Sequence, residues 1–184
     1  VMLAALLTPG TTKLKCLPSR NHTELLFKYL NIPTKIKKIK SFDLIEVKGK
    51  KNYKSFNYNI PVDISSASFF IVLTLLSKNS KIKIKNININ PSRTGIITIL
   101  NSMGAKILFL KKKKYKGEIN ADILLKSQKN LKAINVPKKI NSTAIDEILL
   151  LFLVTAMYTG ISPFHGLEER NKQDTKIRNW GFKI

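Results

Sequence analysis

Apolar residues along the chain recur with two different periods. At residues 22–30 and 94–102 they return every three or four positions, which predicts helices with one apolar stripe. At residues 11–17 and 81–87 they alternate with polar residues, which predicts strands with one buried and one exposed face. Neither kind of element covers its own apolar face, so we expect the elements to pack against one another.

The same order of elements starts three times, at Val1, Asp63 and Thr143, and each copy opens with an apolar helix. Further helices are expected at residues 65–76 and 144–158, and further strands at 34–39, 43–47, 106–110, 122–125 and 131–135. The charged residues 111–116 predict a mobile loop. Because one such unit cannot bury both kinds of apolar face, we predict an α+β fold of stacked units.

Polar residues also stand where side chains commonly cap the starts of helices. We expect this role for Asn21, Asp63, Ser65, Ser92 and Thr143. A strand ladder gives way to the next helix near residues 61–63, and we place a domain boundary there.

The chain is strongly basic, with 33 Lys and Arg against 11 Asp and Glu, a formal net charge of +22. Such an excess is typical of nucleic-acid-binding proteins when it gathers on one surface. Here many lysines alternate with isoleucine, as in residues 81–85, which favours the solvated face of a strand. The lysine-rich strands also lack aromatic residues that would stack on bases. We expect no nucleic-acid partner, and the alternative is a non-catalytic basic repeat protein that binds nucleic acid.

Cys16 is the only cysteine, so no intrachain disulfide forms, and a reducing, cytoplasmic location is expected. With it, His22 and His165 are too few to predict a zinc site. No run reaches the roughly 18 apolar residues that a membrane span needs, so no membrane partner is expected. The start of the chain lacks a basic flank and begins within an apolar helix, which indicates a piece of a longer protein rather than a signal peptide.

Four short segments carry a resemblance. Residues 18–24 read Pro-Ser-Arg-Asn-His-Thr-Glu, residues 61–67 Pro-Val-Asp-Ile-Ser-Ser-Ala, residues 90–95 Asn-Pro-Ser-Arg-Thr-Gly and residues 145–148 Ile-Asp-Glu-Ile. They resemble, in order and spacing, segments of the 3-phosphoshikimate 1-carboxyvinyltransferase (EPSP synthase) family. The related UDP-N-acetylglucosamine enolpyruvyl transferases are similar in fold but lack the Asp-Ile-Ser-Ser pattern, so they are the second alternative.

The resemblance implies repeated βαβαββ units of the enolpyruvyl transferase fold, an inside-out α/β barrel whose ligands bind between two domains. Residues 1–62 would be the last unit of one domain, and residues 63–184 one full and one partial unit of the other. The implied reaction, in aromatic amino acid biosynthesis, moves the enolpyruvyl group of phosphoenolpyruvate to the 5-hydroxyl of shikimate 3-phosphate. The implied partners are these two small molecules, without metal or organic cofactor, and the complete protein is expected to be a monomer.

The resemblance also implies site residues. Ser19 and Arg20 would hold the phosphate of shikimate 3-phosphate, and Asp146 would accept the proton of the attacking hydroxyl. Lys172 would contact phosphoenolpyruvate and act in catalysis, where its charge would serve the developing anion. These residue types suit polyanionic substrates, because arginine forks bind phosphate and carboxylate in a bidentate manner and helix starts attract anions. Without the resemblance, Ser19 and Asp146 would equally be helix caps.

Residues 170–176 depart from the family segment Arg-x-Lys-Glu-Ser-Asp-Arg, since they read Arg-Asn-Lys-Gln-Asp-Thr-Lys. Gln173 cannot transfer a proton as a glutamate does. Lys176 keeps a charge for substrate binding but loses the bidentate fork of arginine. The family motifs expected before Val1 are also absent, so we predict little or no turnover by these 184 residues alone.

Overall fold

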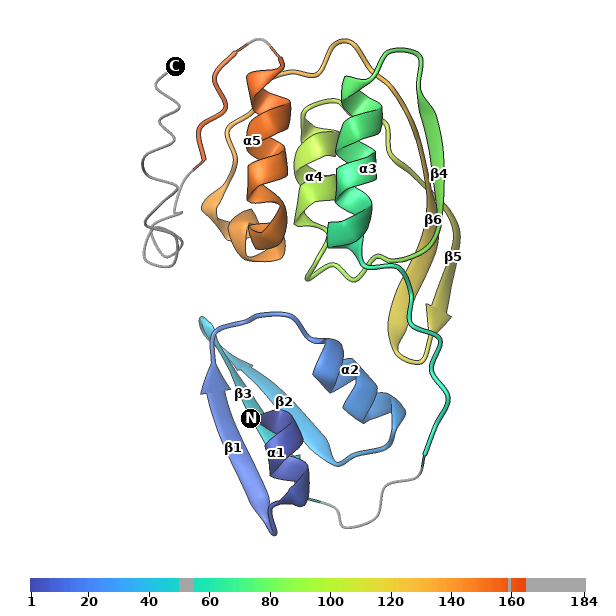
Figure 1. Cartoon of the computed structure of the whole chain (residues 1–184). Coiled ribbons are helices and arrows are strands. Elements are labelled where there is room, and N and C mark those ends of the chain that lie inside the picture. The colour runs from blue at the N-terminus through green and yellow to red at the C-terminus, as the bar shows by residue number, and fades with distance from the viewer. Residues whose placement is uncertain (50–54, 159, 165–184) are drawn as a thin grey trace.

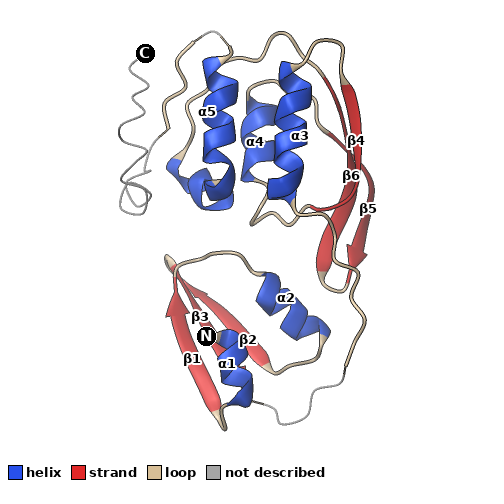
Figure 2. Cartoon of the chain, in the orientation of Figure 1, coloured by secondary structure: helices blue, strands red, loops and turns tan. Residues whose placement is uncertain are grey.

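The computed structural model describes residues 1–49, 55–158 and 160–164, with only the backbone of residues 138, 139 and 141. Two units follow each other along the chain (Figures 1 and 2). The first unit consists of α1 (Met2–Leu7), β1 (Thr11–Cys16), α2 (His22–Tyr29), β2 (Thr34–Ile39) and β3 (Phe42–Lys48). The second unit consists of α3 (Ile64–Leu76), β4 (Lys81–Asn88), α4 (Gly95–Ser102), β5 (Leu108–Tyr115) and β6 (Glu118–Lys126). Two 3-10 helices, η1 (Lys138–Thr143) and η2 (Ile145–Glu147), then lead into α5 (Ile148–Ala156).

Both units have the same topology. Each forms a three-stranded antiparallel sheet, in the order β1-β3-β2 and β4-β6-β5, so the last strand of each unit lies in the middle. Val62 adds an isolated parallel bridge to Ile87, which supplies a minimal opening strand and completes the βαβαββ order in the second unit. The expected α+β fold of repeated units is therefore confirmed for these two copies.

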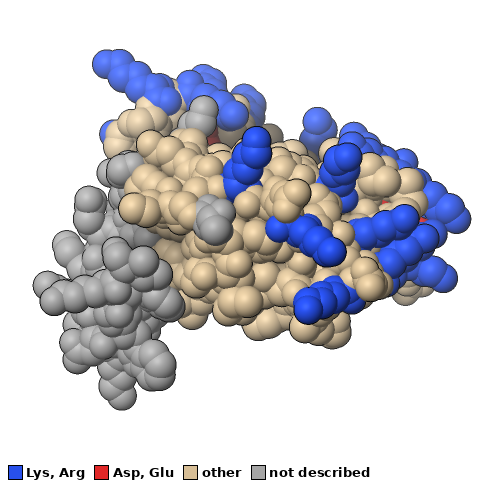
Figure 3. All heavy atoms as spheres, turned by 90° about the horizontal axis from the view of Figure 1, so that it is seen from above, with Lys and Arg blue, Asp and Glu red and all other residues tan. Residues whose placement is uncertain are grey.

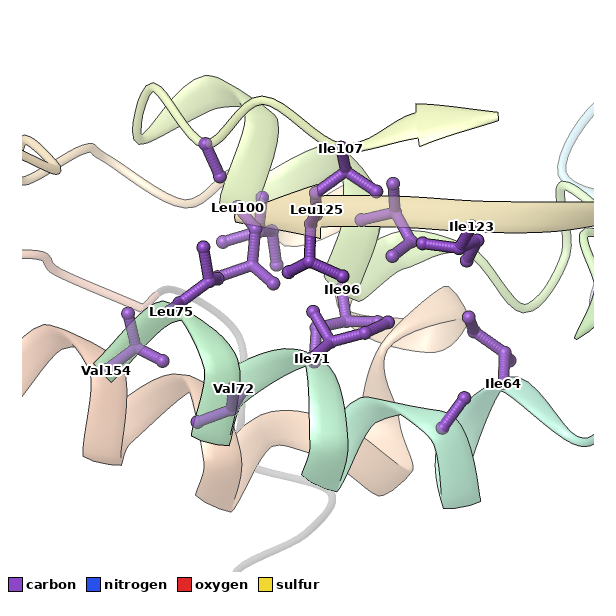
Figure 4. Close-up of a cluster of buried hydrophobic side chains, with 14 of the residues drawn as sticks. Ile64, Ile71, Val72, Leu75, Ile96, Leu100, Ile107, Ile123, Leu125 and Val154 are labelled. Carbon is purple, nitrogen blue, oxygen red and sulfur yellow. The ribbon is translucent and has the colours of Figure 1, made fainter. Parts of the chain in front are cut away.

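The larger core lies in the second unit and its contact with α5 (Figure 4). Ile71 of α3, Leu100 of α4 and Ile123 of β6 are fully buried and meet between the helices and the sheet. Leu151 and Val154 bring α5 into the same cluster. The core of the first unit is much smaller and consists of Ala5, Phe27, Ile32, Ile45 and Val47 with partly buried neighbours. The second unit therefore forms the main rigid support for the residues described below.

The β5–β6 hairpin joins the two units. Its two turn residues, Lys116 and Gly117, both have positive φ angles, 48° and 91°, as tight hairpin turns require. A Cβ atom on Gly117 would lie 2.9 Å from the carbonyl oxygen of Leu25 in α2, so only glycine allows this approach. The ammonium of Lys116 lies 5.3–6.0 Å from the centroids of four aromatic rings, those of Tyr29, Phe56, Tyr58 and Tyr115. These cation–π contacts hold α2, the connecting segment and the hairpin together.

A polar network beside the hairpin fixes the start of α2. Nδ1 of His22 lies 2.5 Å from Oε1 of Glu118, whose side chain is only 7% exposed. Nδ2 of Asn90 donates to Oε2 of Glu118 at 3.1 Å and to Oδ1 of Asn21 at 2.8 Å. Buried polar groups are costly unless they are paired, and here the pairs cross from one unit to the other. The loop before α2 is thereby placed against the second unit.

Four of the five predicted caps are wrong. Ser65 lies within α3, and its hydroxyl donates to Glu147 instead. Asp63 does cap α3, because its Oδ1 accepts from the backbone N–H of Ser65 at 3.3 Å. Asn21 instead accepts from Asn90 across the unit boundary, and Ser92 donates to Asn90 while Thr94 takes the cap position of α4. Thr143 lies in η1 and donates to the carbonyl of Ile140. Other hydrogen bonds compete successfully for these short polar side chains, across the units for Asn21 and within three residues for Ser92 and Thr143.

Three element predictions need correction. Residues 111–116 are not a loop, since β5 continues to Tyr115 and pairs with β6 after a register shift between Leu110 and Lys113. Residues 131–135 form no strand, and the only bridge nearby joins Val136 to Phe164 in the described part. The helix predicted from residue 144 begins as η2, and α5 starts at Ile148. The network around η2, described below, holds this segment in a tighter geometry than the apolar pattern indicates.

Lys and Arg side chains gather toward the edge of the molecule that carries the β4–β6 sheet (Figure 3). Lys81, Lys83 and Lys85 of β4 are exposed, while Ile82 and Ile84 between them are partly buried. This arrangement is the solvated strand face that the alternation predicts.

Candidate active site

Arg20 and Asp146 meet although 126 residues separate them in the chain. Arg20 lies in the loop between β1 and α2, and Asp146 lies in η2 just before α5. Nη2 of Arg20 donates to Oδ2 of Asp146 at 2.5 Å, and the two side chains are 39% and 44% exposed. Two of the predicted site residues are therefore brought together at a surface that solvent reaches.

Arg93 lies next to this pair and is much less exposed, at 14%. Its Nη2 donates to Oδ1 of Asp63 at 2.8 Å and to Oγ of Ser65 at 2.7 Å, and it lies 3.8 Å from Oδ2 of Asp146. Oδ2 of Asp146 thus faces two guanidinium groups. We call Arg20, Asp63, Arg93 and Asp146 the ion-pair cluster. Arg93 belongs to one of the four resembling segments, and its partners belong to two others. The cluster therefore links the starts of α3 and α4 to η2.

Ser65 and Glu147 form the buried side of the cluster. The hydroxyl of Ser65 donates to Oε1 of Glu147, and its oxygen accepts from Arg93. Glu147 is 2% exposed. Burial raises the pKa of Glu147 above its ordinary value of 4.5, against the hydrogen bond from Ser65, and the neighbouring charge of Asp146 adds to the rise. Glu147 is therefore a structural acid behind Asp146, and its own protonation affects the support of the cluster.

Glu147→Gln is expected to change stability in a pH-dependent way. A raised folded-state pKa means that the native state favours the neutral acid, so Glu147 costs stability as the pH rises above 4.5. Glutamine is neutral at every pH and keeps an oxygen for the hydroxyl of Ser65. Urea unfolding should show the variant equal to the wild type at pH 4 and more stable at pH 7. A variant that is less stable at pH 7 would show that the attraction to Arg93 outweighs burial.

The remaining predicted site residues are placed less completely. Ser19 is exposed in the same loop as Arg20. Lys172, Gln173 and Lys176 lie outside the described residues. Arg93 was given no role in the sequence analysis. A signal was present, because Arg93 and Asp63 each stand just before an apolar helix in two of the resembling segments, and this could have indicated their ion pair.

A cavity of about 420 Å³ lies on the side of the cluster that faces the hairpin. It is lined by His22, Leu26, Phe56, Tyr58, Ile60, Pro61, Asp63, Ile64, Asn88, Arg93, Lys116 and Glu118. Within the described ranges, no three His, Cys, Asp or Glu side chains group in a way that would hold a metal ion. The helices in that part of the chain are also too short or too polar to cross a membrane.

The sequence model of one family, EPSP synthase (3-phosphoshikimate 1-carboxyvinyltransferase), matches residues 1–176. The chain belongs to the EPSP synthase family. It is similar to the 3-phosphoshikimate 1-carboxyvinyltransferase of Zymomonas mobilis, with 35% identity over 96% of this chain and 39% of that protein. The corresponding protein of Petrotoga mobilis is 36% identical over 97% of this chain and 41% of its own length.

The fold agrees with this membership of the family. A solved structure of EPSP synthase from Acinetobacter baumannii matches with a TM-score of 0.74 and 33% identity, over 86% of this chain and 36% of that one. The chain thus spans about two fifths of the length of these relatives. The predictions of the EPSP synthase family and of its α+β fold of repeated units are confirmed.

Proposed function

We propose that the protein to which these residues belong transfers the enolpyruvyl group of phosphoenolpyruvate to the 5-hydroxyl of shikimate 3-phosphate. The observation that carries the proposal is the meeting of Arg20 and Asp146 from two distant family segments. Arg20 supplies a fork for the phosphate of shikimate 3-phosphate, with Ser19 beside it. Asp146 is the base that accepts the proton of the attacking hydroxyl. A general base of this kind typically raises the reaction rate by a factor of about 10²–10⁴.

Lys172 and Lys176 complete the proposed site as cations for phosphoenolpyruvate and the phosphate that leaves. Lys176 lacks the planar fork of the family's arginine, and Gln173 lacks the acid of the family's glutamate. The proposal for the isolated 184 residues is accordingly substrate binding with little or no turnover. We place the complete enzyme in the cytoplasm as a monomer.

We divide the chain into residues 1–62, the last unit of one domain, and residues 63–184, which begin the other. Uncovered apolar faces support this division. Phe69, Phe70 and Leu73 of α3 are 56–64% exposed, and Leu149 and Leu153 of α5 are 51% and 48% exposed. Apolar faces of this kind favour burial against further units, as expected of a chain that covers two fifths of its relatives.

Titration of the 184-residue chain with shikimate 3-phosphate tests the proposal. We expect calorimetry to show binding, and Arg20→Gln to weaken it about tenfold or more, since a charged hydrogen bond contributes about 1.5–3 kcal/mol. Lys38→Gln removes the same charge from exposed strand β2 and is expected to leave the affinity unchanged.

Three other results would contradict the proposal. They are equal affinities of Arg20→Gln and the wild type, tighter binding of UDP-N-acetylglucosamine than of shikimate 3-phosphate, and RNA binding that falls steeply with salt while shikimate 3-phosphate does not bind.

A further inference from the structure

We propose that the Arg20–Asp146 ion pair is a closed form of the site that a phosphate group opens. In this exchange the phosphate binds the guanidinium of Arg20 in place of Asp146, and Arg93 remains next to the carboxylate of Asp146. The base is thereby released for a substrate hydroxyl only when a phosphorylated ligand is bound. This inference rests on the proposed roles of Arg20 and Asp146 and concerns how the two roles are coupled.

The first argument is that one oxygen atom serves two cations. Oδ2 of Asp146 lies 2.5 Å from Nη2 of Arg20 and 3.8 Å from Nη2 of Arg93. When Arg20 leaves, the carboxylate still has an opposite charge within ion-pair distance. An uncompensated charge is therefore not created by the exchange, which keeps its cost low.

The second argument is that the two arginines differ in their contacts and in their exposure. Arg93 is 14% exposed and is fixed by hydrogen bonds to Asp63 and Ser65. Arg20 is 39% exposed, and among the described residues its guanidinium has one ion pair, with Asp146. A dissolved anion reaches Arg20 without breaking other contacts, whereas Arg93 stays in place as the second partner of the carboxylate.

The third argument is that phosphate is the stronger partner for an arginine fork. It carries about −1.5 to −2 charges at pH 7 and has three strong acceptor oxygens, compared with one charge and two oxygens on Asp146. Exposed ion pairs contribute little to stability because water screens them, so the Arg20–Asp146 pair is readily exchanged. A ligand without a phosphate group lacks this advantage and leaves the base masked.

Inorganic phosphate, titrated into the 184-residue chain by calorimetry at fixed ionic strength, is the probe. If Asp146 competes with phosphate for Arg20, Asp146→Asn should bind phosphate about two- to fivefold more tightly, as expected from the energy of an exposed pair. Arg93→Gln should weaken phosphate binding by a similar factor, because Asp146 then depends on Arg20 alone. In the Asp146→Asn background the same Arg93→Gln change should have no effect, since the competitor is gone.

Asp122→Asn is the matched control. It removes a carboxylate from the ion pair between Lys83 of β4 and Asp122 of β6, and it should leave phosphate affinity unchanged. Weaker or unchanged binding by Asp146→Asn, or an equal effect of Arg93→Gln in both backgrounds, overturns the exchange. If Arg20→Gln does not weaken phosphate binding, the proposed function fails instead.

A second measurement needs no variant of Asp146. Side-chain nitrogen spectra of the wild type should show phosphate shifting the Arg20 guanidinium resonances while those of Arg93 remain. Equal shifts of both arginines would also overturn the exchange.

Discussion

Ile71→Ala is expected to lower the free energy of unfolding by about 2–5 kcal/mol. Ile71 is fully buried at the centre of α3, where it meets α4, α5 and the β4–β6 sheet (Figure 4). Removing three methyl or methylene carbons there loses hydrophobic burial and leaves a cavity that the surrounding helices and sheet cannot fill completely. Urea unfolding followed by circular dichroism measures the change.

Leu73→Ala on the same helix is the matched control. Leu73 is 62% exposed, so its truncation is expected to change stability by about 0.5 kcal/mol or less. Equal losses for the two variants would mean that α3 does not bury the face that carries Ile71. Because α3 also carries Ser65 at its start, a loosened core should weaken the support of the ion-pair cluster.

Gly95→Ala is expected to lower stability by about 1–3 kcal/mol and to displace the segment that carries Asp146. Gly95 is buried at the start of α4. A Cβ atom there would lie 2.4 Å from Oγ1 of Thr143, 2.7 Å from its carbonyl carbon and 2.8 Å from Cβ of Ala144. The clash involves backbone, so η1 and η2 must move away from α4. Hydrogen exchange at residues 140–150 should accelerate in the variant.

Gly10→Ala is the control for Gly95→Ala. Gly10 has a φ of 91° but nothing within 4 Å of an added Cβ, so its replacement strains the local turn without a clash. We expect a loss of about 1–2 kcal/mol and unchanged exchange at residues 140–150. Unchanged exchange in Gly95→Ala as well would show that this glycine does not set the position of η2.

The ion-pair cluster was predicted from the sequence only in part. The resemblance predicted a set of site residues, and the structure brings Arg20 and Asp146 of that set together. The role of Arg93 was not predicted. Its partners, Asp63, Ser65 and Asp146, come from two other segments, and a single sequence does not show which segments meet. The network of Glu118 with His22 and Asn90 was missed for the same reason.

The errors in the strand at residues 108–115 and in the helix caps have a different, mostly local cause. Lysine-rich residues 111–114 looked like a loop because their charge hid a strand, which pairs with the next strand β6 across a two-residue turn. Asn21, Ser92 and Thr143 looked like caps because short polar side chains favour that role locally. In the folded chain, other polar groups were close enough to compete for them.

By itself the sequence determined the alternation of helices and strands, the repeat of the unit and the membership of the EPSP synthase family. These depend on periodicity and on short motifs, which are local properties of the chain. Only the tertiary structure decided that Arg20 and Arg93 both lie near Oδ2 of Asp146 and that Glu147 is buried behind Asp146. It also decided that the β5–β6 hairpin turn packs against α2. Such contacts depend on distances between segments far apart in the chain, and those distances are fixed when the units pack.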